Sequence, residues 1–232
     1  MMTRTRRELR REETEAEIKE VARRQMVEVG AAALSLRSIA REMGLTAPAL
    51  YRYFPNRDAL VTALIVEAYQ SLAAAMIEAE AAQARDDFHG RFQSLAFAFR
   101  AWAVQYRQDF ALIYGTPIPG YVAPREQTVS PASQVLQAIG TVLIAAWQAG
   151  RLTIPHSYQD IPPAMDTAVT DILQSLPAGV PLGGVVLTMT VWARLYGVVW
   201  GELFEHFPPG LAETGALYEM EVTAICVELG LR

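Results

Sequence analysis

Side chains that could bind a metal or act as nucleophiles are sparse in this chain. It contains three histidines and one cysteine, Cys226. Glu202 and His206 are four residues apart, so on one helix they would point the same way and could share a metal ion. Two ligands without further histidine or cysteine nearby make a weak site. No glycine-rich phosphate loop, nucleophile elbow or spaced cysteine cluster occurs, so we expect no metal, no cofactor and no catalytic residue.

Arginine is the residue type that is best suited to binding here. Lys19 is the sole lysine, so nearly every cation is a guanidinium, which suits two-pronged contacts with phosphates and guanines. Biased genomic composition is the other explanation of this preference. Residues 1–60 carry 12 Arg and Lys against 9 Asp and Glu, a net charge of +3, whereas residues 61–232 carry 8 against 16, a net charge of −8. The overall charge is −5, yet this asymmetry favours an amino-terminal end that meets nucleic acid.

The chain begins with a basic arm. Residues 3–11, TRTRRELRR, contain five arginines and one glutamate. Such an arm could lie along phosphates or reach into a minor groove. A frayed, solvated terminus is the other interpretation. Beyond it, apolar residues at helical spacing predict an amphipathic helix from Thr14 to Val29.

Residues 34–60 read as three short helices separated by two breaks. Ser35 is a good N-cap for a first helix that ends at Gly44, since glycine accepts the left-handed conformation found there. Thr46 and Asn56 are N-caps for the next two helices. Two short helices joined by a tight glycine turn make a helix-turn-helix, whose second helix can enter the major groove of DNA. A plain αα-hairpin inside a helical core is the alternative.

The same stretch resembles the DNA-binding motif of the TetR family of bacterial transcriptional repressors. The residues that carry the resemblance are Arg37-x-Ile39-Ala40-x-x-Met43-Gly44-Leu45-Thr46-x-x-Ala49-Leu50-Tyr51-Arg52-Tyr53-Phe54-Pro55-Asn56-Arg57-Asp58-x-Leu60. Two positions depart from the family pattern: Tyr53 stands in place of histidine, and Arg57 in place of lysine. Both keep a hydrogen-bond donor that can reach a phosphate.

The resemblance implies which residues contact DNA. Those expected at base edges are Arg37, Ala47, Ala49 and Tyr51. Those expected to hold phosphates are Thr46, Tyr53, Arg57 and the backbone N–H groups at the cap of Asn56. The whole predicted DNA-binding set is Arg37, Thr46, Ala47, Pro48, Ala49, Tyr51, Arg52, Tyr53, Asn56 and Arg57. Arg37 is the best candidate for reading a guanine, because alanine methyl groups carry little donor or acceptor information.

The rest of the chain predicts further helices and no strand-like alternation. Apolar spacing places them at residues 57–84, 88–106, 108–114, from Ser130 or Ser133 to Gly150, weakly at 164–176, and at 181–204 and 211–229. Proline and glycine predict irregular connections at 115–120 and 151–163. We therefore predict an all-α fold with an N-terminal three-helix helix-turn-helix DNA-binding head, residues 1–60. A larger C-terminal helical bundle for ligand binding and dimerisation, residues 61–232, completes it.

Aromatic side chains in the bundle could fill its core or line a ligand cavity between helices. Family resemblance favours a cavity in the middle of the body. The predicted ligand-binding residues are Phe99, Trp102, Tyr106, Tyr114, Trp147 and, as a polar anchor, Arg194, with Arg100 and Arg107 as alternative anchors.

Residues 181–204 are apolar on nearly every side, which favours burial against a partner subunit. Arg194 and Glu202 interrupt the run, so it is too short and too charged to favour a membrane span. The resemblance implies that the last two long helices pair with their symmetry mates. The predicted interface residues are Val185, Met189, Trp192, Tyr196, Leu217 and Ile225. The run WARLYGVVWG, residues 192–201, also resembles a tryptophan and glycine signature of one TetR subgroup.

These observations predict a homodimeric, ligand-responsive transcriptional regulator. We expect a repressor that is released from its double-stranded DNA operator by a small apolar molecule. A lone cysteine and a charged amino terminus without an export signal predict a cytoplasmic, bacterial protein. The alternatives are a TetR-like activator, or a helical small-molecule-binding or catalytic protein whose helix-turn-helix is incidental.

Overall fold

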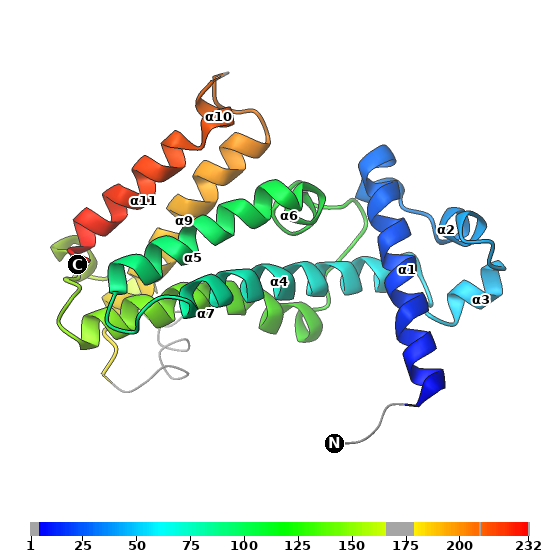
Figure 1. Cartoon of the computed structure of the whole chain (residues 1–232), viewed down its shortest axis with the longest axis horizontal. Helices are drawn as coiled ribbons and strands as arrows, with labels where there is room; N and C mark the ends of the chain where they lie inside the picture. The colour runs from blue at the N-terminus through cyan, green and yellow to red at the C-terminus, as the bar shows by residue number, and fades with distance from the viewer. Residues whose placement is uncertain (1–4, 166–178, 209, 232) are drawn as a thin grey trace. The chain divides into compact units, whose positions relative to one another are not determined.

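A computed structural model describes residues 5–165, 179–208 and 210–231 (Figure 1). All regular structure in these residues is helical, so the predicted all-α fold is confirmed. The weak helix predicted at residues 164–176 lies almost wholly outside them.

Packing divides the chain into two compact units. Unit 1 comprises residues 1–69 and 106–131, and unit 2 comprises residues 70–105 and 132–232.

Unit 1 begins with helix α1, Arg6–Val29, which starts well before the predicted start at Thr14. A capping box explains the earlier start. The Glu8 N–H donates to the Thr5 hydroxyl at 3.3 Å, and the Thr5 N–H donates to the Glu8 carboxylate at 2.7 Å. Apolar spacing could not reveal these turns, because every side chain from Arg6 to Glu13 is exposed. From Arg6 onward, the basic arm is therefore helical and not frayed.

The predicted helix-turn-helix is present. It consists of α2, Leu36–Glu42, and α3, Ala47–Tyr51. The side chains of Ser35 and Thr46 each accept a hydrogen bond, at 3.4 Å, from the backbone N–H three residues later. Gly44 joins the two helices with φ at +66°, a conformation that side chains other than glycine resist. Three local signals in the sequence thus set this motif.

Helix α4, Arg57–Ala81, follows, and its N-cap is Asn56, whose side-chain oxygen accepts from the Ala59 N–H at 2.8 Å. The core of unit 1 also involves the single turn η1, Ala31–Ala33, and helix α6, Arg107–Tyr114. Its buried members are Ile18, Val21, Ala22, Met26, Leu34, Leu36, Ile39, Ala40, Leu50, Phe54, Leu60, Val61, Leu64 and Ile65. Side chains packed against them include Leu112, Ile113, Ile118 and Tyr121. The compact unit therefore does not follow the predicted boundary at residue 60, because a distant segment completes its core.

Unit 2 is a bundle of longer helices (Figure 1). Besides the second half of α4, its main members are α5, Phe88–Gln105; most of α7, Arg125–Gln148; α9, Leu182–Leu203; and α11, Ala216–Leu229. Short pieces are η2, His156–Tyr158, and α10, Leu211–Thr214. Helix α11 packs mainly against α9. The core centres on fully buried Leu72, Met76, Phe92, Leu95, Phe99, Val142, Val199, Tyr218 and Val222.

Two predicted helix boundaries in this region are wrong. Helix α7 starts at Arg125, before Ser130 and Ser133, and includes Pro131. A proline normally argues against a helix interior, but residues up to Pro131 pack in unit 1, and this tertiary packing outweighs the local penalty.

The last predicted helix, residues 211–229, is broken at Gly215, where φ is +69°. A Cβ atom at Gly215 would lie 2.7 Å from Cζ of Arg100, so the arginine of α5 packs directly on this glycine. A long-range contact thus occupies the space at the break between α10 and α11, which the apolar spacing alone could not predict.

Candidate nucleic-acid interface

The predicted recognition helix α3 lies at the surface of unit 1. Leu50 is its fully buried residue and anchors it to the core. Thr46, Pro48 and Tyr51 are exposed, and Tyr51 retains 41% of its accessible surface. A helix held by one inward leucine presents the rest of its circumference to an incoming surface. This arrangement suits insertion of α3 into a groove.

Arg37 lies in the first turn of α2 and is exposed. The buried side of that helix carries Leu36, Ile39 and Ala40. Helix α2 packs directly on α3, and Arg37 is exposed beside it in sequence and fold. The exposure of Arg37 is compatible with a contact to DNA, and its role in base reading stays a prediction.

Polar contacts hold α2 on α1. Gln25 donates from Nε2 to the Ser38 hydroxyl and to the Glu42 carboxylate, at 3.1 Å each. Arg24 pairs with Glu42 at 2.9 Å. Hydrogen bonds from Arg24 and Gln25 lower the pKa of Glu42 below its ordinary value. These contacts fix the orientation of the helix-turn-helix relative to its supporting helix.

The predicted phosphate contacts after α3 occupy different environments. Tyr53 is half-buried, and the guanidinium of Arg11 lies 5.9 Å from its ring centre. Arg57 is half-buried and donates from Nη2 to the Ala31 carbonyl at 3.4 Å. Its Nε atom is buried without a hydrogen-bond partner among the described residues. Arg57 is thus partly engaged by its own unit, and its phosphate contact stays a prediction, as does that of exposed Asn56.

An ion-pair network joins α1 to α4 and α6 within unit 1. Arg23 pairs with Glu67 at 3.0 Å and with Asp109 at 3.1 Å, and Lys19 pairs with Glu67 at 3.1 Å. Burial raises the pKa of Asp109 although Arg23 opposes this, whereas hydrogen bonds from Lys19 and Arg23 outweigh burial and lower the pKa of Glu67. No local sequence pattern could signal this network, since its carboxylates, Glu67 and Asp109, lie 44 and 86 residues from Arg23.

The predicted ligand-binding aromatic residues are not gathered around one cavity. Phe99 and Trp102 are buried in the core of unit 2, where the Trp102 indole donates to the Ser71 hydroxyl at 3.0 Å. Tyr106 and Tyr114 belong to unit 1. Trp147 lines an apolar crevice of unit 2 with a volume of about 10 Å³, which is room for about one water.

Two of the predicted polar anchors, Arg194 and Arg100, are engaged in ion pairs. Arg194 pairs with Glu221 and Glu228 of α11, and Arg100 pairs with Glu202 of α9 at 2.7 Å. The ring of His206 stacks on Trp200 at 4.4 Å. Glu202 and His206 thus have other partners, and no group of three or more potential metal ligands occurs among the residues that the structure describes.

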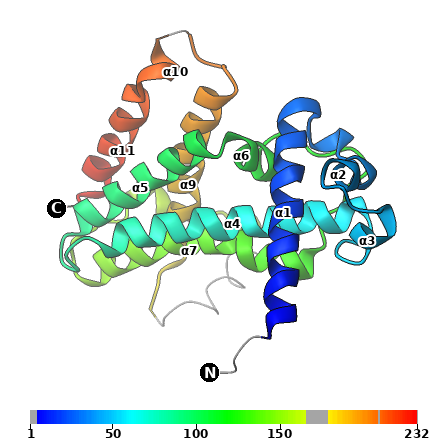
Figure 2. The same cartoon turned by 45° about the vertical axis from the view of Figure 1, so that its right-hand side comes forward.

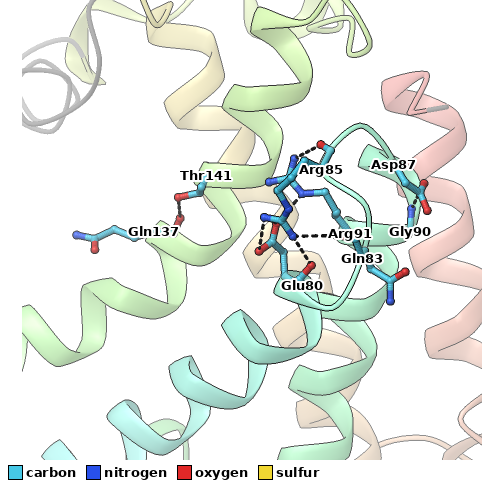
Figure 3. A network of polar contacts seen from close by, with 8 residues as sticks. All are labelled: Glu80, Gln83, Arg85, Asp87, Gly90, Arg91, Gln137 and Thr141. Carbon is cyan, nitrogen blue, oxygen red and sulfur yellow. Dashed lines mark hydrogen bonds and ion pairs between the residues drawn. The ribbon is translucent and has the colours of Figure 1, made fainter.

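A larger cleft of about 240 Å³ lies in unit 2, between α4, α5 and α7. Its lining combines apolar and polar side chains: Ile77, Glu80, Leu95, Gln134, Gln137, Ala138 and Thr141. Figure 3 shows Glu80 beside Arg85 and Arg91, both of which donate to its carboxylate. On α7, the Thr141 hydroxyl donates to the Gln137 carbonyl at 2.7 Å. Sequence reasoning missed this cleft because it searched for aromatic residues, and none lines it.

The residues that were predicted at the dimer interface fall into two groups by burial within the subunit. Val185 and Ile225 are 5% and 0% exposed, so they pack in the core of their own subunit, and their predicted role at the dimer interface stays a prediction. Met189, Trp192, Tyr196 and Leu217 are half-buried. The most exposed apolar side chains of α11 are Met220 and Val227, at 69% and 76%. Only 33% of the most apolar stretch of α9 is buried within the subunit.

Known proteins resemble this chain over nearly its whole length. Residues 18–64 match the family described as bacterial regulatory proteins, tetR family, and residues 92–225 match the Tetracyclin repressor-like C-terminal domain. Curated HTH-type transcriptional regulators of Mycobacterium tuberculosis and Mycobacterium bovis are each 33% identical over 222 residues, covering 94% of this chain and 93% of the relative.

Solved structures agree with this match. One of a regulatory protein is 36% identical, covers 95% of this chain and 98% of its own, and has a TM-score of 0.77. A tetR family transcription regulator from Shewanella is 17% identical, covers 94% of this chain and 98% of its own, and has a TM-score of 0.62, a likeness of fold alone.

Proposed function

The chain belongs to the TetR family and is a DNA-binding transcriptional regulator, and we propose that it acts as a homodimeric repressor that a small molecule releases from its operator. The observation that carries the proposal is helix α3 at the surface, which Leu50 anchors to the core while Pro48 and Tyr51 are exposed and Ala47 and Ala49 are half-buried. Two such helices in a symmetric dimer would enter successive major grooves about 34–36 Å apart.

Within each half-site, Arg37 reads a guanine and the methyl groups of Ala47 and Ala49 contact thymine methyl groups. Thr46 and Tyr53 hold phosphates. The exposure of Arg37 and Thr46 supports these roles. Because most of the affinity comes from phosphates, binding should weaken steeply as salt rises.

Fluorescence anisotropy on the DNA upstream of its own gene tests the proposal. We expect salt-dependent binding, and Arg37→Ala should cost about 1–3 kcal/mol and relax the preference at one base position. Arg125→Ala removes an equally exposed arginine from the start of α7 and is the matched control. Equal weakening of the Arg37 variant on every sequence would contradict base reading, and a wild type that shows no salt-dependent binding would contradict DNA binding altogether.

The partner in the proposed dimer is a second copy, which covers α9 and α11. Support comes from the apolar side chains that these helices leave exposed, above all Met220 and Val227. A carboxylate buried in such an interface would be desolvated without a partner, so Val227→Glu should yield monomers in light scattering. Val122→Glu places the same charge at a side chain that is 86% exposed and should leave the dimer intact. If the Val227→Glu protein stays dimeric, the dimer interface does not include this part of α11.

We place the effector in the cleft lined by Glu80 and Thr141. Its volume of about 240 Å³ lies just below the range of about 300–1,000 Å³ for typical ligand sites, so the effector should be compact. The mixed lining suits an apolar body with one or two polar groups, in place of the wholly apolar molecule expected from aromatic residues.

One connection supports coupling between this cleft and DNA binding, because helix α4 begins next to the helix-turn-helix and carries the cleft residues Ile77 and Glu80 near its end. Within unit 1, Arg23 also ties α1 to Asp109 of α6. A useful effector would favour the released state by about 1–3 kcal/mol. A compound that binds tightly and leaves operator affinity unchanged would contradict this coupling.

The proposal also places the protein in the cytoplasm with its DNA. Helices α4, α7 and α9 are long and apolar enough to cross a membrane by length and composition. In the structure, 50%, 44% and 33% of the respective apolar stretches are buried within the subunit, so these side chains help to form its core.

A further inference from the structure

The first turns of α1 carry a basic stripe in line with the buried side of the same helix. Steps of three or four residues connect Arg7, Arg11, Thr14, Ile18, Val21 and Gln25. The last three are buried in unit 1, whereas Arg7 and Arg11 are exposed. The side of α1 that faces the core therefore becomes basic where the helix extends beyond that core.

The position of Arg11 indicates that the stripe lies beside the proposed DNA-binding surface. Its guanidinium lies 5.9 Å from the ring centre of Tyr53, which follows α3 and is a proposed phosphate contact. The Arg11 side chain stays 63% exposed, and its ion pair with Glu15 at 2.9 Å is a surface pair within one helix. Such pairs are weak, so a phosphate can compete for the guanidinium.

The stripe is held on a rigid element. The capping box of Thr5 and Glu8 closes the start of α1, and Figures 1 and 2 show these turns extending beyond α3. Arg7 lies one turn before Arg11, which places it about 6 Å further along the axis. Since a helix is about 10–12 Å wide and the minor groove only about 6 Å, these turns cannot thread into that groove.

We propose that the first turns of α1 form a second DNA-contacting element, in which Arg7 and Arg11 bind backbone phosphates beside the groove that α3 enters. This inference rests on the proposed DNA binding and adds contacts that the helix-turn-helix does not supply. Because the backbone of these turns is already ordered in a capped helix, no backbone entropy has to be lost for the arginines to bind.

The test compares Arg7→Gln/Arg11→Gln with wild type on one operator over a salt series. Each phosphate contact contributes about 0.9 to the slope of log K against log salt, so removing both contacts should reduce the slope by about 1.8 per subunit. Loss of charge-assisted hydrogen bonds should weaken low-salt affinity about tenfold or more per subunit. Base preference should not change. Arg7→Lys/Arg11→Lys keeps both charges and should keep the slope.

Arg125→Gln/Arg151→Gln removes the same charge from exposed sites outside the head and is the matched control, which should leave the slope unchanged. Circular dichroism should show the same helix content in all variants. If the wild type binds and Arg7→Gln/Arg11→Gln keeps its affinity and slope, the inference is wrong and the proposed function survives. A changed base preference would overturn the assignment to phosphates. A wild type that does not bind DNA would overturn the proposed function itself.

Discussion

Both units contain an arginine that pairs with a buried carboxylate, but in different surroundings. In unit 1, Arg23 bridges Asp109 and Glu67, whose side chains are 9% and 41% exposed. In unit 2, Arg100 pairs with Glu202, whose side chain is 2% exposed. The carboxylate of Glu67 is open to water, whereas that of Glu202 is not. The comparison indicates that the first is suited to a joint that rearranges, and the second to holding a fold.

The unit 2 pair should give the largest effect. Arg100→Ala leaves Glu202 buried without its arginine, and breaking a buried pair from one side costs about 3 kcal/mol. Urea unfolding followed by tryptophan fluorescence measures the loss. Arg85→Ala is the control, since Arg85 is 60% exposed and Glu80 keeps Arg91, so it should cost less than about 1 kcal/mol. If Arg100→Ala and Arg85→Ala lower the free energy of unfolding equally, the buried pair contributes no more to stability than the exposed one.

The unit 1 network should give a smaller stability effect and a larger functional one. Arg23→Ala should cost about 1–2 kcal/mol, because Glu67 can rehydrate and Asp109 can take up a proton. If the network couples α6 to the head, the variant should still bind its operator but respond less to an effector in the same anisotropy assay.

Arg24 provides the control on the same helix. Its ion pair with Glu42 is exposed on both sides, so Arg24→Ala should change stability by no more than about 0.5 kcal/mol and leave the effector response unchanged. If the Arg23 variant responds to the effector like the wild type, the network contributes to stability and not to the effector response.

Cys226 gives the smallest effect and probes the interior of unit 2. Burial raises the pKa of its thiol from about 9.0 to about 11. The unfolded thiol therefore loses its proton first, so its contribution to stability is complete below pH 9 and is lost as pH rises toward 11. Relative to Cys226→Ala, the wild type should lose on the order of 1–2 kcal/mol over that interval, measured by urea unfolding. A constant difference would mean that water reaches the thiol.

The helix-turn-helix and the proposed ligand site differ in how far the sequence could predict them. Ser35, Gly44 and Thr46 act on backbone within three residues, so their types and spacing predicted the helix-turn-helix. Apolar spacing likewise predicted the helix at residues 57–84, close to the bounds of α4. The ligand site was not predictable in this way, because a cleft depends on which helices meet. Aromatic residues such as Phe99 and Trp102 fill the core, and the cleft is lined by Gln137 and Thr141.

The incorrect boundaries have the same origin. Local rules start a helix at Ser130 or Ser133 and continue one through Gly215, yet α7 starts at Arg125 and α11 begins only after the glycine. In each case a segment distant in the sequence determines where the helix begins. Packing in unit 1 supports the first turns of α7, and Arg100 occupies the space beside Gly215.

Residue types at short, fixed spacing were enough to establish the all-α class, the caps and turn of the recognition motif, and the family. The membership of unit 1, the pairing of Arg23 and Arg100, and the places of Val185 and Ile225 emerged only from the folded chain. Burial and ion pairing depend on which segments meet after folding, and for these residues the partners lie far away along the chain.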